Sequence, residues 1–386
     1  MQRGSTGTWQ MVSAGGEAVR AFVPAALPPV PPLDMPAARQ QKLEQALLAL
    51  GRLDAIAALL PEPDIFLYAY VRREAVLSSQ IEGTQSSLSD LLIFELDEAP
   101  GVPFDDVVEV SNYVAALEHG MARLKEGFPL CNRLIRELHA KLLARGRGAG
   151  KAPGEFRATQ NWIGGTRPGN AIFVPPPPQE VEPCMGELER FLHDADSPGA
   201  LVKAALAHVQ FETIHPFLDG NGRVGRLLIA FILHHEGVLR QPLLYLSLYF
   251  KQHRGEYYRL LDTVRQTGDW EAWLDFFLEG VAATAQDAVD TAHRLLALFA
   301  ADRERLLKLG RAAPNALRVF DVLRHRPVVN IKLLAERAGV SFATAARMVE
   351  ALQKLGIVRE ITGRARERVF VYGGYLDLLA LVGAGE

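Results

Sequence analysis

The residues from His215 to Arg226 combine side-chain types that could carry out chemistry on a phosphate group. They read HPFLDGNGRVGR and separate two segments with helical patterns, so we expect a loop that opens a helix. His215 could accept a proton near neutral pH. Asp219 is a hard oxygen ligand of the kind that Mg²⁺ uses beside a nucleotide.

The glycines and arginines of the same motif could form a binding site for an anion. Gly220 and Gly222 would let backbone N–H groups approach an anion closely, and the start of a helix attracts phosphate. Arg223 and Arg226 are three residues apart, so they share one helix face and can both donate to phosphate oxygens. Taken singly, each could be an ordinary loop or turn residue, but the combination favours a phosphoryl-type transfer site.

The elements that must position this loop are nearly all helical, which predicts an all-α fold class. A helix capped by Ser87 or Ser89 should reach about residue 98. The spacing of apolar residues predicts further helices over residues 37–60, 65–79, 105–126, 132–144, 179–193, 199–213, 222–235, 253–267 and 270–308.

Two segments interrupt the helical pattern. Residues 24–36 hold six prolines, so this stretch is expected to be extended, either as an arm lying on the body or as a disordered leader. Residues 145–180 are dense in Gly and Pro, and long irregular segments of this kind tend to be functional. The short β-prone stretch Ala171–Val174 predicts a small hairpin there.

A separate C-terminal domain is expected after a boundary at Arg311–Pro314. Three short helices (315–325, 331–338 and 342–355) precede two strands (357–361 and 368–372), which is the order of a winged helix-turn-helix. The wing carries Arg359, Arg364, Arg366 and Arg368, which could contact DNA phosphates. The recognition helix is modest in charge, so protein contact or dimerisation is an equally open use of the domain.

Composition adds few constraints. The chain has 386 residues and a net charge of −3, so its overall charge requires neither a nucleic acid nor a membrane as partner. Its two cysteines, Cys131 and Cys184, form neither a disulfide framework nor a zinc spacing. There is no apolar stretch of membrane-spanning length and no signal-peptide core, so the cytoplasm is the expected location.

Every fixed position of HPFLDGNGRVGR matches the signature of the Fic family, which runs His-Pro-Phe-x-Asp-Gly-Asn-Gly-Arg, then two residues and Arg. The chain therefore resembles that family over roughly residues 20–290. The resemblance implies a Fic-type helical core and a protein adenylyltransferase, which moves AMP from ATP to a Ser, Thr or Tyr hydroxyl of target proteins and of itself. ATP and Mg²⁺ are the implied cofactors, and the choice of the α-phosphate comes from the family alone.

The resemblance also assigns roles to the motif residues. His215 takes the proton from the target hydroxyl, and Asp219 holds Mg²⁺ against the phosphates. Arg226 holds the γ-phosphate of ATP. The implied ATP- and phosphate-binding residues are Gly220, Asn221, Gly222, Arg223, Val224, Gly225, Arg226 and Tyr257.

The implied role of Tyr257 is to line the adenine pocket, and the alternative is a core tyrosine on an amphipathic helix. Family members often have an amide where Arg265 stands, so that contact is left open. The Gly/Pro-rich segment resembles the family's flap, in which Ile172, Phe173 and Val174 would dock the target by strand pairing. The alternative is a structural loop with a buried Trp162.

Residues 78–83, SSQIEG, match the family's inhibitory pattern, Ser or Thr, three residues, Glu, then Gly or Asn. Glu82 would pair with Arg226 and remove the partner of the γ-phosphate, so that ATP binds with its α-phosphate misaligned. The alternative is a solvated carboxylate at a helix end.

These features divide the chain into an N-terminal arm and helix (1–60), a Fic catalytic domain with its inhibitory helix (61–300) and the winged helix-turn-helix domain (311–386). Two other functions fit the same residues. One is removal of AMP, with Glu82 positioning water. The other is a nucleotide-sensing transcription regulator that acts through the winged helix. A homodimer is possible, but no periodic interface stripe indicates one.

Overall fold

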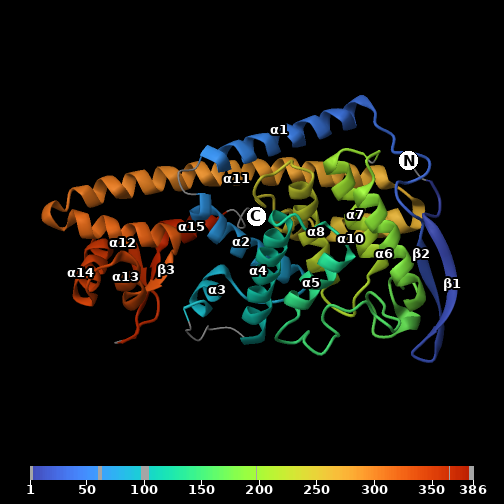
Figure 1. Ribbon diagram of the computed structural model, residues 1–386, viewed down its shortest axis with the longest axis horizontal. Helices are drawn as coiled ribbons and strands as arrows, with labels where there is room; N and C mark the ends of the chain where they lie inside the picture. Colours follow the sequence, from blue (N-terminus) through green and yellow to red (C-terminus); the bar gives the residue numbers. More distant parts are fainter. Residues whose placement is uncertain (1–2, 60–62, 97–103, 197, 365, 382–386) are drawn as a thin grey trace.

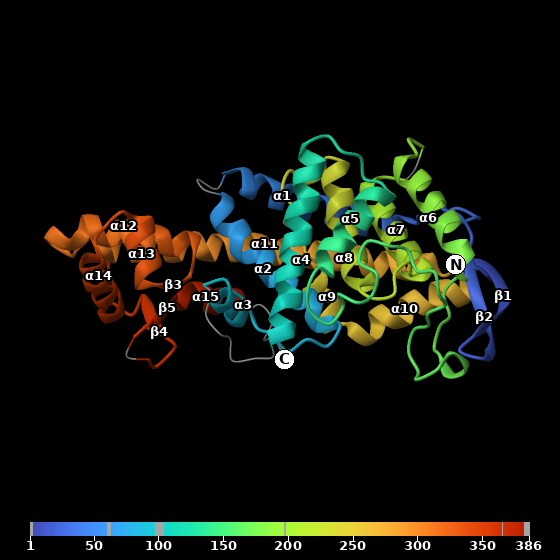
Figure 2. The same ribbon diagram turned by 60° about the horizontal axis from the view of Figure 1, so that its bottom comes forward.

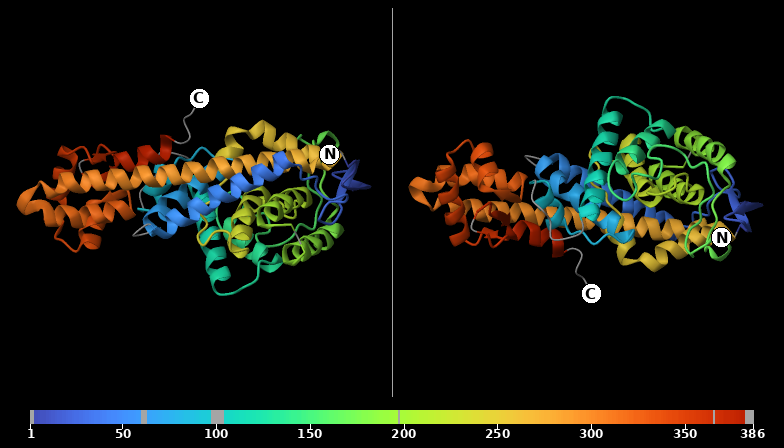
Figure 3. Two further views of the ribbon diagram at one scale, coloured as in Figure 1. Left: turned by 90° about the horizontal axis from the view of Figure 1, so that it is seen from above. Right: turned by 90° about the horizontal axis from the view of Figure 1, so that it is seen from below.

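The computed structural model describes residues 3–59, 63–96, 104–196, 198–364 and 366–381. Over these residues the fold is mostly helical, which confirms the predicted class. Two long helices form its spine: α1 (Ala37–Leu59) lies along α11 (Trp270–Leu307) (Figure 1; Figure 3). None of the helices in the described ranges has the length and apolarity needed to cross a bilayer.

The helical body is built around the pair α7 (Ala200–Ile214) and α8 (Asn221–His235), which pack on each other and are joined by the motif loop. Both helices bury apolar side chains on every side, as their apolar sequences require. The remaining helices of the body are α2 (Pro63–Ile81), α3 (Leu88–Phe94), α4 (Phe104–Lys125), α5 (Asn132–Leu142), α6 (Pro178–His193), α9 (Ser247–Gln252) and α10 (Arg254–Thr267).

A β-hairpin that the sequence analysis did not predict precedes the proline-rich stretch. Strands β1 (Gly7–Ala14) and β2 (Glu17–Pro24) pair antiparallel, and Gly15 and Gly16 make the turn with φ values of 57° and 81°. Residues 25–36 contain no helix or strand, as six prolines in 24–36 suggest. They lie against the start of α11, where the Asp34 N–H donates to Glu271 (2.9 Å).

The C-terminal module lies at the opposite end of α11 from the hairpin (Figure 1). Its helices are α12 (Ala313–His325), α13 (Ile331–Ala338), α14 (Phe342–Lys354) and α15 (Gly373–Leu381), and its antiparallel sheet has the order β3 (Val328–Asn330), β5 (Val369–Tyr372), β4 (Val358–Glu360). The predicted helices and both predicted strands are present. Strand β3 and helix α15 are additions, too short or too uniformly apolar to show a period.

This module packs directly on the helices that precede the motif (Figure 2). The Tyr375 hydroxyl donates to the Ile65 carbonyl of α2 (2.8 Å). Leu92 of α3 packs in one apolar cluster with Val328 and Leu376 of the module. Helix α2 therefore contacts both α8 and the C-terminal module, and α3 contacts the module through Leu92.

Candidate active site

The motif loop reverses the chain between α7 and α8. His215 follows the last residue of α7 with φ 49° and ψ 59°, in the left-handed region that non-glycine residues rarely adopt, and Gly220 begins α8 with φ 76°. The His215 N–H still donates to the Phe211 carbonyl (2.9 Å), so this strained residue stays hydrogen-bonded to α7. The loop therefore presents His215 and the first turn of α8 side by side in sequence and in space.

Buried polar side chains hold this loop in one conformation. The Asn221 side chain accepts from the Phe217 N–H (2.9 Å) and donates to the Phe217 carbonyl (2.8 Å). His139 of α5 donates from Nε2 to the Asp219 carbonyl (3.0 Å) and accepts the Gly154 N–H at Nδ1 (2.8 Å), which fixes its tautomer. Burial lowers the pKa of His139 to about 4, so it stays neutral. His139 cannot be recognised as a site residue from the sequence, because its position fits the pattern of an ordinary amphipathic helix.

Glu82, at the end of α2, reaches the first turn of α8. Arg226 donates from Nη2 to the Glu82 carboxylate (2.8 Å) and to the Ser78 carbonyl (3.0 Å), and from Nε to the Ser78 hydroxyl (2.8 Å). A Cβ on Gly222 would lie 2.3 Å from the same carboxylate, so only glycine allows this approach. Burial opposes the charge of Glu82, but Arg226 outweighs it and lowers its pKa.

Arg223 and Asp219 form a second charged group at the start of α8. Arg223 is buried and donates from Nη1 to Glu109 of α4 (3.3 Å) and from Nη2 to Asp219 (3.5 Å). The Asp219 side chain is 43% exposed, and its Oδ1 accepts the Gly220 N–H (2.6 Å). A carboxylate that opens to solvent beside a phosphate site suits Mg²⁺, which prefers one or two carboxylates together with substrate phosphates and water. The residues present therefore fit the ion.

The imidazole of His215 is kept neutral by its surroundings. Burial is the largest cause, and the positive charges of Arg265 and Arg157 add to it, so its pKa falls to about 3. Nδ1 has no hydrogen-bond partner within the described chain. A neutral imidazole with a free nitrogen can accept a proton from a substrate hydroxyl.

Two buried carboxyl groups near Arg226, Glu74 and Glu212, differ from Glu82 in their ionisation. Burial raises the pKa of each to about 7. The Tyr113 hydroxyl donates to Glu74 (3.1 Å), and the Ser247 hydroxyl donates to the same oxygen. Neither carboxylate was singled out from the sequence, because a glutamate inside a helical pattern carries no local sign of burial.

Glu74→Gln is expected to change stability in a pH-dependent way. Between about pH 4.5 and pH 7 the folded protein keeps a proton on Glu74 that the unfolded chain releases, so stability falls as pH rises through this interval. The substitution should therefore increase the free energy of unfolding by up to about 3 kcal/mol above pH 7 and add little below pH 4.5. Urea unfolding at both ends of this range measures it. The exposed Glu118→Gln is the control, and an equal effect of Glu74→Gln at both pH values would contradict the assignment.

The two neighbouring tyrosines of α10 lie in different surroundings. Tyr257 is buried, its ring stacks on Phe250 (4.6 Å between centroids), and its hydroxyl donates to Nε2 of His208 (2.9 Å). His208 in turn donates from Nδ1 to the Gly225 carbonyl (2.9 Å). Tyr257 thus connects α10 to α7 and α8 from inside the core. Tyr258, which is 42% exposed, is the accessible aromatic here, and the sequence analysis did not select it.

The flap contains one isolated antiparallel bridge, between Ile163 and Phe173. Ile172 is 75% exposed, whereas Phe173 and Val174 are buried. The Val174 carbonyl accepts the N–H of Phe22 (2.9 Å), so strand β2 already covers this part of the flap edge. Trp162 is 38% exposed, which differs from the alternative of a loop with a buried tryptophan.

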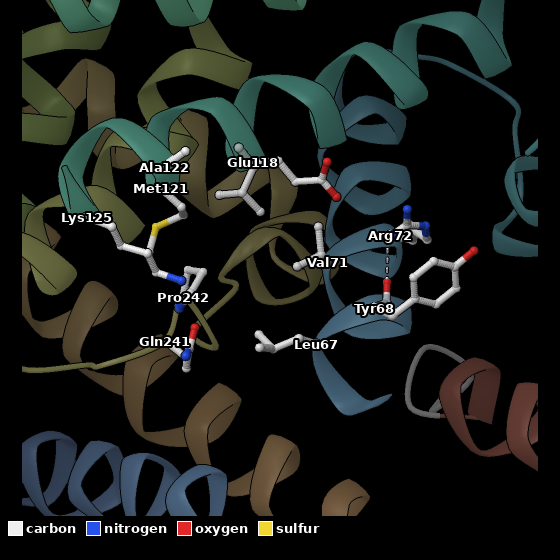
Figure 4. Close-up of a pocket in the computed structure, with 11 residues that line it drawn as sticks. Leu67, Tyr68, Val71, Arg72, Glu118, Met121, Ala122, Lys125, Gln241 and Pro242 are labelled. Atoms are coloured by element: carbon white, nitrogen blue, oxygen red, sulfur yellow. Dashed lines mark hydrogen bonds between the residues drawn. The ribbon is translucent and has the colours of Figure 1, made fainter. Parts of the chain in front are cut away.

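A pocket of about 320 Å³ lies away from the motif, between α2, α4 and the segment before α9 (Figure 4). It is lined by Leu67, Tyr68, Val71, Arg72, Leu117, Glu118, Met121, Ala122, Lys125, Gln241 and Pro242. Arg72 is already held by Glu95 (2.8 Å) and by the Tyr68 carbonyl (3.0 Å). Because no motif residue lines it, this pocket is not the phosphate site.

The sequence matches three family models. Residues 40–122 match the Fic/DOC family N-terminal model, residues 129–233 the Fic/DOC family model, and residues 312–361 the IclR helix-turn-helix domain. Among curated relatives, protein adenylyltransferase Fic of Drosophila grimshawi is 32% identical and that of Drosophila melanogaster 31% identical, each over 181 residues. The match covers 46% of this chain and 34% of each relative, so the chain spans about a third of their length.

Solved structures show the same fold. A Fic family protein from Desulfovibrio desulfuricans G20 is similar with a TM-score of 0.58 and 20% identity, over 89% of this chain and 98% of that one. Fic-1 from C. elegans is similar with a TM-score of 0.52 and 24% identity, over 66% of this chain and 72% of that one. With the complete motif, the helical body and the family matches in agreement, the part of the chain from residue 40 to residue 233 belongs to the Fic/DOC family.

Proposed function

We propose that this protein transfers AMP from ATP to a hydroxyl side chain of a protein, itself included, and that Glu82 restrains the reaction. The observation that carries the proposal is the complete motif folded around the start of α8, with Arg226 bound by Glu82. The curated relatives named protein adenylyltransferase support it over the part of their length that this chain spans.

The transfer needs a base, an anion site and a leaving group. His215 accepts the proton as the target O–H bond breaks, the hydroxyl oxygen bonds to the α-phosphorus, and pyrophosphate leaves with the electrons of the broken P–O bond. The N–H groups at the start of α8, from Gly220 to Gly222, and Arg223 would bind the phosphates. Asp219 would hold Mg²⁺, which when bound offsets phosphate charge.

The inhibition follows from a shared partner. Arg226 is buried and has its donors directed at Glu82 and Ser78, so it is engaged before a γ-phosphate arrives. The side chain of Glu82 is only 37% exposed and lies against Gly222, where a phosphate would bind. A second anion in this place meets charge repulsion, so Glu82 has to move before ATP can bind with its α-phosphate aligned.

The position of the radioactive phosphate tests the reaction. Incubated with Mg²⁺, the purified protein should acquire label from α-³²P-ATP and none from γ-³²P-ATP, because pyrophosphate leaves. Label from γ-³²P-ATP would show phosphate transfer instead. Loss of label from AMP-modified protein in the absence of ATP would favour the alternative function, AMP removal.

A second function, DNA binding by the C-terminal module, is favoured by its charge. Residues 311–386 contain twelve Lys and Arg against seven Asp and Glu, a net charge of +5, whereas residues 1–310 carry −8. Arg347 and Lys354 are exposed on the recognition helix α14, which Ser341 caps by accepting the Thr344 N–H. These basic side chains could contact the phosphates of duplex DNA. A nucleotide-sensing transcription regulator that acts through this module is therefore the second proposed function.

Duplex DNA of mixed sequence should bind at low salt, with an affinity that falls as salt rises. Replacing both Arg347 and Lys354 by alanine should reduce the slope of log affinity against log salt by about one for each lost phosphate contact. Fluorescence anisotropy of labelled DNA measures both. Lys125→Ala on α4 is the control, and equal slopes for the wild type and the double variant would contradict a DNA role for α14.

Three further expectations remain proposals. The unit that carries the transfer is residues 61–300, between the N-terminal segment 1–60 and the module 311–386. We also propose that the protein acts in the cytoplasm and that it can form a homodimer, which sedimentation velocity would detect.

A further inference from the structure

Arg265 of α10 lies between the end of α7 and the flap. Its side chain is buried, and it donates from Nε to the Thr213 hydroxyl (3.1 Å) and from Nη2 to the Glu212 carbonyl (3.1 Å). Its guanidinium also lies over the ring of Phe173 in the flap, 4.1 Å from the centroid. One side chain therefore contacts the end of α7 and Phe173 of the flap at the same time.

The contacts with α7 suit an arginine for physical reasons. The last carbonyls of a helix lack partners within the helix and carry partial negative charge, so a cation stabilises them. The planar guanidinium can bond to two acceptors in fixed directions, which a lysine cannot do. His215 follows Thr213 by two residues and is held in a left-handed conformation. A change in the Glu212 carbonyl or the Thr213 hydroxyl would therefore be passed on to His215.

A second buried arginine binds the carbonyls at the same end of α7. Arg157, at the start of the flap segment, donates from Nε to the His215 carbonyl (2.9 Å) and from Nη2 to the Pro176 carbonyl (2.6 Å). Neither Arg157 nor Arg265 has a carboxylate within ion-pair distance in the part of the chain that the structure describes. Burying two guanidinium groups against main-chain carbonyls and one hydroxyl is costly, so their placement points to a need for fixed geometry.

The flap side of Arg265 continues outward as a row of aromatic rings. Phe173 lies 6.1 Å from Phe22 of β2, and Phe22 lies 4.9 Å from Trp9 of β1, measured between ring centroids. Trp9 is exposed, so the row runs from the protein surface to the guanidinium. The N-terminal hairpin thus supports the flap ring on which Arg265 rests.

We propose that Arg265 is a positioning residue for the transfer reaction: it fixes the end of α7, and with it His215, against Phe173 of the flap. This inference rests on the proposed function. It also gives Arg265 a role different from the one that the amide of related proteins would suggest, because its donors meet α7 and its face meets Phe173. The base, the target hydroxyl and the α-phosphate must be aligned within a fraction of an ångström, which such a brace provides.

The test uses the full chain with Glu82→Gly as the parent, so that inhibition does not limit the rate. Arg265→Met removes both the charge and the planar guanidinium with its two directed donors, whereas Arg265→Lys keeps the charge alone. Arg259→Met, which replaces an exposed arginine of the same helix, is the control. Self-labelling rate at saturating ATP, ATP affinity and the pH profile of the rate are measured for each. We expect Arg265→Met to lower the labelling rate at saturating ATP by about ten- to a hundredfold, while its ATP affinity stays within about twofold of the parent. Arg265→Lys should recover part of this rate, and Arg259→Met should match the parent.

The pH profile separates positioning from general loss of structure. Besides burial, the charges of Arg265 and Arg157 lower the pKa of the His215 imidazole, whereas the charge of Glu82 and a hydrogen bond with the Glu212 backbone raise it. In the Glu82→Gly parent, loss of the Arg265 charge should move the acid limb of the profile to higher pH, whereas Arg265→Lys should move it less. A profile that moves while the saturated rate stays unchanged would contradict the brace and leave only a charge effect of Arg265.

Two further results would also contradict the positioning role of Arg265. A weaker ATP affinity with an unchanged saturated rate would make Arg265 a nucleotide contact. If Arg265→Met does not fold, Thr213→Val removes one partner of the guanidinium and should still lower the saturated rate by about three- to tenfold; no effect would refute the brace. A parent without label would refute the proposed function, and this proposal with it, whereas a labelled parent with an unaffected Arg265→Met would refute only the brace.

Discussion

Glu82→Gly is expected to raise self-labelling from α-³²P-ATP by about ten- to a hundredfold over the wild type. Glu82 accepts one hydrogen bond from Arg226, and its carboxylate lies 2.3 Å from the position of a Cβ on Gly222, so its removal frees both the guanidinium and the space at the start of α8. Arg226 keeps its contacts with Ser78, which hold it in place for a γ-phosphate. Label incorporated per minute at saturating ATP measures the effect.

Glu82→Gln separates the charge of Glu82 from its volume. It keeps the size but removes the charge, so we expect it to raise the labelling rate less than Glu82→Gly does. Glu95→Gln is the control: it breaks a carboxylate contact with Arg72 at the end of α3 and should leave the labelling rate unchanged. If Glu82→Gly instead abolished removal of AMP from modified protein without raising transfer, Glu82 would act on water and the hydrolase alternative would stand.

Much of the helical body could be predicted from the sequence, because helices such as α8 and α11 have long apolar patterns and clear ends. The N-terminal hairpin was missed although the pair Gly15-Gly16 between two β-prone runs is a hairpin signal. The six prolines of residues 24–36 favour an extended arm in this region and give no sign of the strands before them. Strand β3 and helix α9 have three and six residues, which is too few for a period to be distinguishable from chance.

The site residues that are close together in sequence could be predicted. The residues that join the site only because the chain folds could not. The string from His215 to Arg226 carries its chemistry in local order. Glu109 contacts Arg223 across 114 positions in sequence, and Arg265 contacts Thr213 across 52. Such partners lie inside regular helical patterns, so their identity depends on how the helices pack, which local spacing does not encode.

His215→Ala is expected to lower transfer by about three orders of magnitude or more in the Glu82→Gly parent, because the target hydroxyl then has no base to accept its proton. ATP should still bind, since the N–H groups at the start of α8, Arg223 and Arg226 do not depend on the imidazole. Labelling rate and ATP affinity, measured on the same preparation, separate the two effects.

His235→Ala, at the exposed end of α8, is the matched control and should keep the parent rate. A His215→Ala variant that retained transfer would remove the imidazole from the mechanism and leave the loop as a nucleotide sensor. A variant that lost ATP binding together with transfer would instead show that His215 maintains the loop itself. The left-handed backbone of this residue, anchored by Arg157 and the Phe211 carbonyl, argues against that second result, because its main-chain bonds do not involve the side chain.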